Sequence, residues 1–237
     1  MHNIKLLIEY DGTNFYGWQI QPGLRTVQGE LEKVIKNTTN APIKLIGAGR
    51  TDQGVHALGQ VANFRAQINL STEKLRQAIN SLTQDDIYIK KIEFVDERFN
   101  SRYSALAKIY RYHITFIPSP FKIKYNWYVN YQLNIEKMKQ VLNYLVGEHD
   151  FKNFSISNGP ENTTCHIMKA NLTDTLDGII IEFEGNRFLR RMVRGMVGFL
   201  VDLGRGRFKI KNSEEVWHIP ELYFAPPQGL FLIKVKY

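Results

Sequence analysis

The chain has 237 residues, of which 43% are hydrophobic, with a formal net charge of +8 and a single cysteine. No stretch approaches the roughly 20 apolar residues of a membrane span. One cysteine, Cys165, allows no internal disulfide, which favours a reducing compartment such as the cytoplasm. The six histidines and this cysteine show no metal-ligand spacing, so we expect no metal site. The surplus of lysine and arginine suits a polyanionic partner such as nucleic acid.

The first half of the chain alternates strand and helix patterns. Ile4–Tyr10 predicts a first strand rather than a cleaved leader, because Glu9 interrupts its short apolar run. Thr26 and Ser71 are candidate helix N-caps, and apolar residues follow each of them at helical spacing. The remaining apolar stretches predict strands over residues 43–48, 60–65 and 87–95. The predicted order is βαββαβ.

The second half repeats this order. Residues 107–116 predict a strand, and Asn134 is the candidate N-cap of the next helix. Two more strands are expected over 166–173 and 178–184, followed by a helix from about Phe188 to Leu203. A last strand is predicted from Gly229 to Tyr237. Together the patterns predict an α+β protein of two ferredoxin-like βαββαβ halves, with domains at 1–103 and 104–237.

The most informative stretch is Gly47–His56, which places Asp52 two residues after Arg50 among glycines. In extended backbone two such side chains point the same way. A guanidinium beside a carboxylate keeps the acid ionised, as an anionic nucleophile or base requires. On local grounds alone, a structural turn with a surface ion pair is the commoner explanation. The stretch lacks the third glycine of a dinucleotide fingerprint and the Gly-Lys-Ser/Thr of a P-loop.

Residues 49–57, Gly-Arg-Thr-Asp-Gln-Gly-Val-His-Ala, resemble the signature of the TruA-type tRNA pseudouridine synthases, which isomerise uridines in tRNA. Other segments resemble that family in the same order along the chain. They are Glu9–Gln19 with Val27-Gln28 and Leu31-Glu32, then Lys108–Tyr112, Asn186–Gly198 and Ala225–Leu232. These segments span almost the whole chain, so chance is a poor explanation of the similarity.

The resemblance implies an active-site cleft between the two halves, in which Asp52 faces Tyr110 and Arg194. Asp52 would be the catalytic carboxylate, acting as a nucleophile on ribose or base, or as a base on the sugar; both routes stay open. Arg50 would keep Asp52 ionised and help to hold the target nucleotide out of its stack. Tyr110 would lie against the flipped uracil, whereas the pattern leaves Tyr112 as a packing residue.

Further residues are assigned to RNA binding by the same resemblance. Leu230 matches an apolar residue that packs on the target base. Arg187, Arg190 and Arg191 would contact phosphates, on a helix where Arg190 and Arg194 lie one turn apart on a shared face. Without the resemblance, a solvated basic face is an equally good interpretation of these arginines.

Three other residues need separate interpretation. Asp11 is the alternative catalytic acid, although an aspartate before a glycine is more often a turn residue. His56 is expected to form a hydrogen bond within its loop. His166 stands in a region where the family often carries an arginine, which leaves substrate contacts there in doubt.

The leading hypothesis is therefore a cofactor-free and metal-free isomerase of uridine in tRNA. The resemblance implies targets at positions 38, 39 and 40 of the anticodon stem-loop, and a homodimer. The alternative is a non-catalytic tRNA-binding or tRNA-folding module. Such a module explains the positive charge, but it gives Arg50 and Asp52 no role. A nucleoside hydrolase would use Asp52 but has no need of the positive charge.

Overall fold

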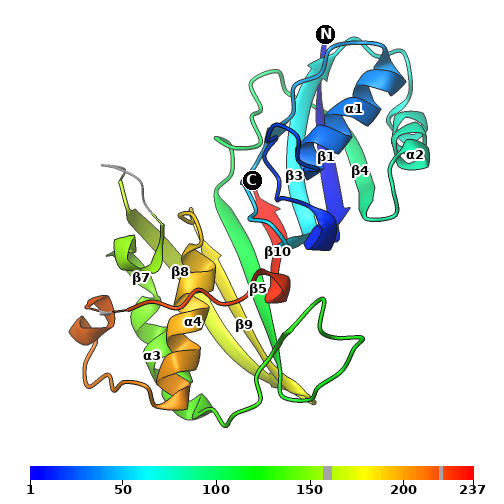
Figure 1. Ribbon diagram of the computed structural model, residues 1–237. Helices are drawn as coiled ribbons and strands as arrows, with labels where there is room; N and C mark the ends of the chain where they lie inside the picture. Colours follow the sequence, from blue (N-terminus) through cyan, green and yellow to red (C-terminus); the bar gives the residue numbers. More distant parts are fainter. Residues whose placement is uncertain (157–161, 219–220) are drawn as a thin grey trace. The chain divides into compact units, whose positions relative to one another are not determined.

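A computed structural model describes residues 1–156, 162–218 and 221–237, which divide into two units (Figure 1). Unit 1 contains residues Met1–Leu106 and Phe231–Tyr237, and unit 2 contains Ala107–Leu230. Both combine helices with antiparallel strands, so the chain is an α+β protein as predicted. The ferredoxin-like description of each half stays a prediction.

Unit 1 packs two helices against one sheet. Its strands run in the order β4-β1-β3-β10, with β1 antiparallel to both neighbours and β10 parallel to β3. The short β2 is antiparallel to β3. The elements are β1 (His2–Tyr10), the 3-10 helix η1 (Gly12–Asn14), α1 (Val27–Thr39), β2 (Ile46–Gly47), β3 (His56–Ala66), α2 (Thr72–Leu82), β4 (Ile87–Val95) and β10 (Leu230–Lys236).

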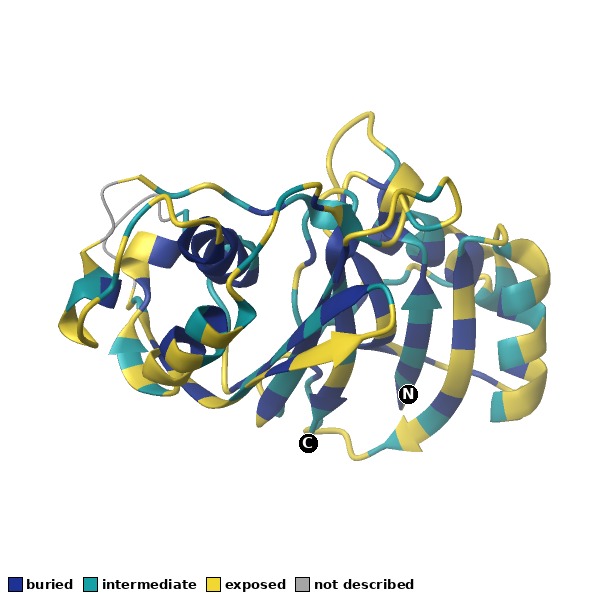
Figure 2. Cartoon of the chain, turned by 90° about the horizontal axis from the view of Figure 1, so that it is seen from below, coloured by how far each residue is buried: buried dark blue, intermediate teal, exposed yellow. Residues whose placement is uncertain are grey.

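Local sequence signals explain both helices of unit 1. The Thr26 hydroxyl accepts a hydrogen bond from the Gly29 N–H, and the Ser71 hydroxyl accepts one from Lys74, so both predicted N-caps are confirmed. The buried side of α1 consists of Val27, Gln28, Leu31, Val34 and Ile35. Along β1, Ile4, Leu6 and Ile8 are buried, and Figure 2 shows buried residues alternating with exposed ones in the strands.

Unit 2 has a four-strand sheet in the order β5-β9-β8-β7, and each of these strands is antiparallel to its neighbour. Asn134 caps its first long helix, as predicted, by accepting from the Lys137 N–H. Its elements are β5 (Ala107–Thr115), β6 (Trp127–Tyr128), α3 (Ile135–Leu142), η2 (Asn143–Leu145), β7 (Gly147–Asp150), η3 (Lys152–Phe154), β8 (Thr164–Thr175), β9 (Gly178–Gly185), α4 (Met192–Arg205), η4 (Glu214–Trp217) and η5 (Pro227–Gly229).

The structure differs from the sequence prediction at the last strand. Residues 231–237 were assigned to the second domain, but they belong to unit 1, where Phe231 and Leu232 of β10 pair with His56 and Ala57 of β3. The boundary between the first and second halves of the chain lies after Leu106, whereas the sequence predicted it after residue 103. The reason is backbone pairing between segments far apart in sequence, which periodicity does not reveal.

Two local predictions also differ. The strand expected over 43–48 shrinks to Ile46–Gly47, because both polar backbone groups of Leu45 bond to side chains of α1: its N–H to Glu32 and its carbonyl to Gln28. The helix expected from Phe188 begins only at Met192, because Arg191 has a left-handed φ of 61° that a helix interior does not accept.

Within the described residues, no helix has the length and apolar character needed to cross a membrane. The same residues contain no cluster of three or more His, Cys, Asp or Glu side chains placed to hold a metal ion.

Candidate active site

The loop that carries Asp52 leaves β2 and enters β3, and hydrogen bonds fix its backbone at both ends. On the entering side the Ala48 N–H donates to the Val61 carbonyl (2.8 Å), and the Gln60 side chain donates to the Gly49 carbonyl (2.9 Å). On the leaving side the Val55 N–H donates to the carbonyl of Asp52 itself, at 3.2 Å. The position of the Asp52 backbone is therefore set by β3.

The segment between η1 and α1 holds the same loop from a second side. The Trp18 N–H donates to the Thr51 carbonyl at 3.1 Å, and the Gly54 N–H donates to the Phe15 carbonyl at 3.3 Å. Gly17 has a φ of +86°, and a Cβ built on it would lie 2.5 Å from the Thr51 carbonyl oxygen and 3.1 Å from the carbonyl carbon of Asp52. Only glycine combines this backbone conformation with such a close approach.

A buried hydrogen bond anchors the residue immediately before Asp52. The Tyr10 hydroxyl lies 2.8 Å from the Thr51 hydroxyl, and both side chains are buried. Burial raises the pKa of Tyr10 far above its ordinary value, so its hydroxyl stays protonated and remains able to donate. Thr51 is thus held from both its backbone and its side chain.

The side chains of Arg50 and Asp52 do not form the predicted pair. Asp52 is half-buried, whereas Arg50 is exposed and its Nε donates to Oε1 of Gln19 at 3.0 Å. Within the part of the chain that the structure describes, no ion pair joins Arg50 to Asp52. The difference arises because the Trp18–Thr51 backbone bond brings Gln19 beside Arg50.

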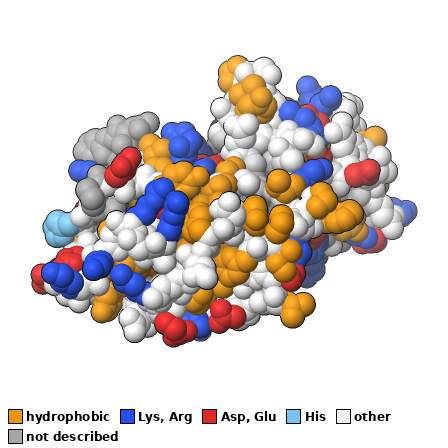
Figure 3. All heavy atoms as spheres, turned by 60° about the horizontal axis from the view of Figure 1, so that its bottom comes forward, with side chains coloured by type: hydrophobic (Ala, Val, Ile, Leu, Met, Phe, Trp, Pro, Cys, Tyr) orange, Lys and Arg blue, Asp and Glu red, His pale blue; other side chains and the backbone are white. Residues whose placement is uncertain are grey.

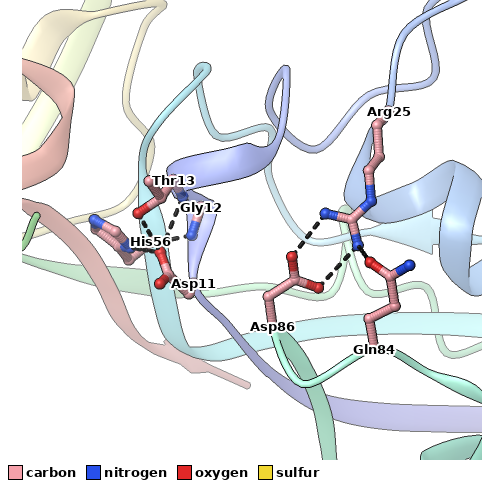
Figure 4. A network of polar contacts seen from close by, with 7 residues as sticks. All are labelled: Asp11, Gly12, Thr13, Arg25, His56, Gln84 and Asp86. Carbon is pink, nitrogen blue, oxygen red and sulfur yellow. Dashed lines mark hydrogen bonds and ion pairs between the residues drawn. The ribbon is translucent and has the colours of Figure 1, made fainter.

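Asp11, the alternative acid, forms a turn network with His56 (Figure 4). One of its carboxylate oxygens accepts from the Thr13 N–H at 2.9 Å and from the Thr13 hydroxyl at 2.6 Å, which caps η1. The same oxygen lies 3.1 Å from Nδ1 of the buried His56, and that nitrogen accepts from the Gly12 N–H at 3.0 Å. The bond from Gly12 thus joins His56 to η1, outside the loop in which the sequence predicted its partner, and Asp11 acts as a turn residue.

A second ion-pair network in Figure 4 fixes the segment after Gln19. The Arg25 guanidinium binds both carboxylate oxygens of Asp86 (2.6 and 2.9 Å) and the Gln84 side chain, and it lies 4.1 Å from the ring centroid of Phe15. Such a bidentate geometry restrains both partners. Residues 15–25 are therefore tied to the loop before β4 as well as to the Asp52 loop.

In unit 2, Tyr110 and Tyr112 lie on β5 and both are buried. The Tyr110 ring meets the edge of Phe188, with 5.0 Å between the ring centroids. The Tyr112 hydroxyl donates to the Pro226 carbonyl at 2.7 Å, and burial raises the pKa of Tyr112 well above its ordinary value. Tyr112 is thus a packing residue, as expected, with its polar end satisfied.

Arg194 lies in the first turn of α4, and the segment before η5 holds it. Its Nε donates to the Ala225 carbonyl at 2.7 Å, and the Ala225 N–H donates to the Arg194 carbonyl at 3.0 Å. Gly198, one turn later, allows this approach, since a Cβ there would collide with the Tyr223 carbonyl. Leu230, which follows η5, is 5% exposed.

The other three predicted arginines precede α4 instead of lying on it. Arg187 and Arg190 are exposed, and the Arg190 carbonyl accepts from the Ile156 N–H at 3.0 Å. Arg191 is the N-cap residue of α4 and has a left-handed backbone conformation. Its guanidinium lies 5.8 Å from the Phe224 ring centroid. Arg190 and Arg194 therefore do not share a helix face, because the helix has not begun at Arg190.

The predicted site residues fall into two sets. Unit 1 holds Arg50 and Asp52 in one loop, and unit 2 holds Tyr110, Leu230 and the four arginines. That the two sets act together in one cleft stays a prediction. Sequence reasoning missed the roles of Gly17 and Gln19, although both lie in the Glu9–Gln19 segment that carried the resemblance.

A family model described as tRNA pseudouridine synthase matches residues 6–104 and 141–237 of the chain. The chain belongs to the tRNA pseudouridine synthase family. The matched ranges include every predicted site residue except Tyr110, which lies in the segment between them.

Relatives of this synthase family align with the whole chain, including the segment around Tyr110. Proteins named tRNA pseudouridine synthase A are 42% identical in Thermoanaerobacter sp. strain X514 and 44% identical in Thermosipho melanesiensis, with all of each chain covered. One from Exiguobacterium sp. is 38% identical over all of this chain and 98% of its own.

Proposed function

We propose that this family member isomerises uridine to pseudouridine in tRNA. The observation that carries the proposal is the Asp52 loop, in which the family signature coincides with a backbone held by β3, by Gly17 and by the Tyr10–Thr51 bond. A positioned carboxylate is the group that the chemistry needs. The names of the curated relatives support tRNA as the substrate.

The reaction breaks the bond between ribose and the uracil nitrogen, turns the base, and forms a bond from ribose to a uracil carbon. A proton leaves that carbon and one returns to the nitrogen, so there is no net oxidation or hydrolysis. We propose that Asp52 assists as a nucleophile or as a base on the sugar. Arg50 is proposed to hold the target nucleotide, and no cofactor is required by these steps.

Unit 2 supplies the remaining proposed roles. Tyr110 is proposed to lie against the flipped uracil, since its ring is fixed by Phe188. Arg194, held through Ala225, is proposed to act electrostatically beside the Asp52 carboxylate, and Leu230 to pack on the base. These assignments rest on the family resemblance and on the fixed placement of each side chain within its unit.

Incubation with unmodified tRNA, without added metal or nucleotide, tests the function directly. Pseudouridine mapping should find product in the anticodon stem-loop, at one or more of positions 38, 39 and 40. Binding without any pseudouridine would support the alternative tRNA-binding or tRNA-folding module instead. Release of free uracil would indicate a hydrolase.

Gln19→Ala should lower the single-turnover rate about three- to tenfold while tRNA affinity stays within twofold. The reason is that Gln19 orients the Arg50 guanidinium, and a hydrogen bond to a charged group contributes about 1.5–3 kcal/mol before solvent exposure reduces it. Gln21→Ala is the matched control, because Gln21 lies in the same segment and its side chain donates to the Tyr16 carbonyl instead of to Arg50. Equal rates for the two variants would contradict the role of Gln19.

Arg187, Arg190 and Arg191 are proposed to contact tRNA phosphates, as expected from the resemblance. The logarithm of the association constant falls as the logarithm of the salt concentration rises, because each phosphate contact releases counterions. Arg190→Ala should reduce the magnitude of this negative slope by about 1. Filter binding at several salt concentrations measures the slope. Arg98→Ala removes the same charge at a side chain that is 93% exposed in unit 1, and it should leave the slope unchanged.

We also propose a homodimer, as the resemblance implies, in the cytoplasm, where one unpaired cysteine is compatible with reducing conditions. Exposed apolar side chains near the β8–β9 turn support self-association: Phe121 is 89% exposed, Ile123 60% and Leu176 99%. Sedimentation equilibrium should show a dimer that Phe121→Ser weakens. Leu82→Ser, at an exposed leucine of α2, should leave it intact.

A further inference from the structure

A basic segment leaves the C-terminal end of α4 and has no part in the proposed chemistry. We call its four cations, Arg205, Arg207, Lys209 and Lys211, the basic ridge. All four are exposed, and they alternate along the chain with Gly206 and with the partly buried Phe208 and Ile210. The lower left of Figure 3 shows lysine and arginine side chains gathered beside carboxylates.

The backbone of the ridge is fixed where it leaves the helix. Gly206 has a φ of +83° and its N–H donates to the carbonyls of Asp202 and Leu203, while the Arg207 N–H also donates to the Asp202 carbonyl at 3.0 Å. The Phe208 ring stacks on the buried Phe199 ring, with 5.3 Å between centroids and an interplanar angle of 22°. The cations therefore project from an ordered base.

Carboxylates near the ridge engage only part of its charge. Arg207 pairs with Asp202 at 3.2 Å, and the Glu215 carboxylate accepts from the backbone N–H of Lys211. Glu214 lies in the same helix η4 as Glu215. Among the described residues, the ammonium groups of Lys209 and Lys211 make no ion pair or hydrogen bond.

Arg205 adds an aromatic partner at the start of the ridge. Its guanidinium lies 4.2 Å from the ring centroid of Tyr131, a geometry that restrains the side chain without neutralising its charge. A restrained guanidinium followed by two unpaired ammonium groups is a surface that matches successive phosphates better than it matches isolated carboxylates.

The ridge lies at the other end of α4 from Arg194, the residue of that helix with a proposed role in the chemistry. Both belong to unit 2, and eleven residues of α4 separate Arg194 from Arg205, which corresponds to roughly 16 Å at 1.5 Å per residue. The ridge is therefore a surface separate from Arg194.

We propose that the basic ridge is a second binding surface for the sugar-phosphate backbone of the tRNA, in addition to the arginines that precede α4. This inference rests on the proposed function, since it assumes an RNA substrate. It assigns the ridge to affinity and not to the chemical step, because its cations hold RNA at a distance from the target uridine.

The test is the double variant Lys209→Gln/Lys211→Gln, measured by tRNA binding across a salt series. Losing two phosphate contacts should reduce the magnitude of the slope of log association constant against log salt concentration by about 1.4 to 1.8, because each contact contributes roughly 0.7–0.9. The pseudouridine rate at saturating tRNA should stay within twofold. Neither ammonium group makes an ion pair or hydrogen bond among the described residues, so folding should be unaffected.

Lys33→Gln/Lys36→Gln is the matched control, because it removes the same charge from two exposed lysines of α1 in unit 1. Equal salt slopes for the two double variants would overturn the proposal, and would leave the ridge available to another acidic partner. Failure of the proposed function is distinguishable: wild-type protein would then bind tRNA without forming pseudouridine, and the effect of the ridge on binding would still be measurable.

Discussion

Asp52→Asn should lower pseudouridine formation at least about 10³-fold while tRNA affinity stays within twofold. The amide has the shape of the carboxylate but cannot act as an anionic nucleophile or base, and positioned acid–base groups alone contribute about 10²–10⁴-fold. The loop backbone should not move, because main-chain groups and the side chains of Gln60 and Thr51 make the hydrogen bonds that hold it. Single-turnover kinetics and filter binding on the same preparation separate the two effects.

Asp11→Asn is the control for this experiment. Asp11 is the other aspartate of the two candidate segments, but it caps η1 and contacts His56. Asparagine caps a helix about as well as aspartate, so the replacement should change the free energy of unfolding by less than about 1 kcal/mol and should leave the rate per folded molecule within a few-fold. Near-normal turnover by Asp52→Asn, or an equal loss in both variants, would contradict the assignment of Asp52.

Gly17→Ala should lower the single-turnover rate about 100-fold, with a much smaller effect on tRNA binding. The new Cβ would lie 2.5 Å from the Thr51 carbonyl oxygen, so the backbone that carries Asp52 has to shift. A displacement near 1 Å at a reacting group can cost about 10²-fold. The positive φ adds a backbone penalty of about 1 kcal/mol to the free energy of unfolding.

Gly23→Ala separates the clash from the backbone penalty. Gly23 also has a positive φ, of +72°, but a Cβ there has no heavy atom within 4 Å. Urea unfolding should show a similar loss of about 1 kcal/mol for this variant, with a nearly unchanged rate. If the two variants reduced the rate equally, general loosening of the segment would explain the effect, and the contact with Thr51 would not.

Much of the fold could be predicted from short-range patterns. The caps Thr26, Ser71 and Asn134 lie where predicted, because a cap depends on a side chain and an N–H only three residues apart. β4 has the predicted bounds as well. The short β7 was missed, since its Gly-Glu-His-Asp sequence has no apolar alternation to indicate a strand.

The residues of the candidate site stay a prediction, whereas several of their contacts differ from those that the sequence suggested. The motif around Asp52 singled out the loop, and the family match includes it. The partner of Arg50 was predicted wrongly, because proximity in sequence suggested Asp52, whereas Gln19 reaches the guanidinium from 31 positions away. The start of α4 was also misplaced, since the segment before it is held by distant residues: the Ile156 N–H bonds to the Arg190 carbonyl, and the Arg191 guanidinium lies over the Phe224 ring.

The amino-acid sequence by itself determined the α+β class and the starts of α1, α2 and α3, because these depend on neighbours within a few residues. Tertiary structure alone decided that β10 joins β3, that Gly17 must lack a side chain, and that the cations of the basic ridge remain unpaired among the described residues. Such features depend on which distant segments come together, and burial and backbone pairing set that choice.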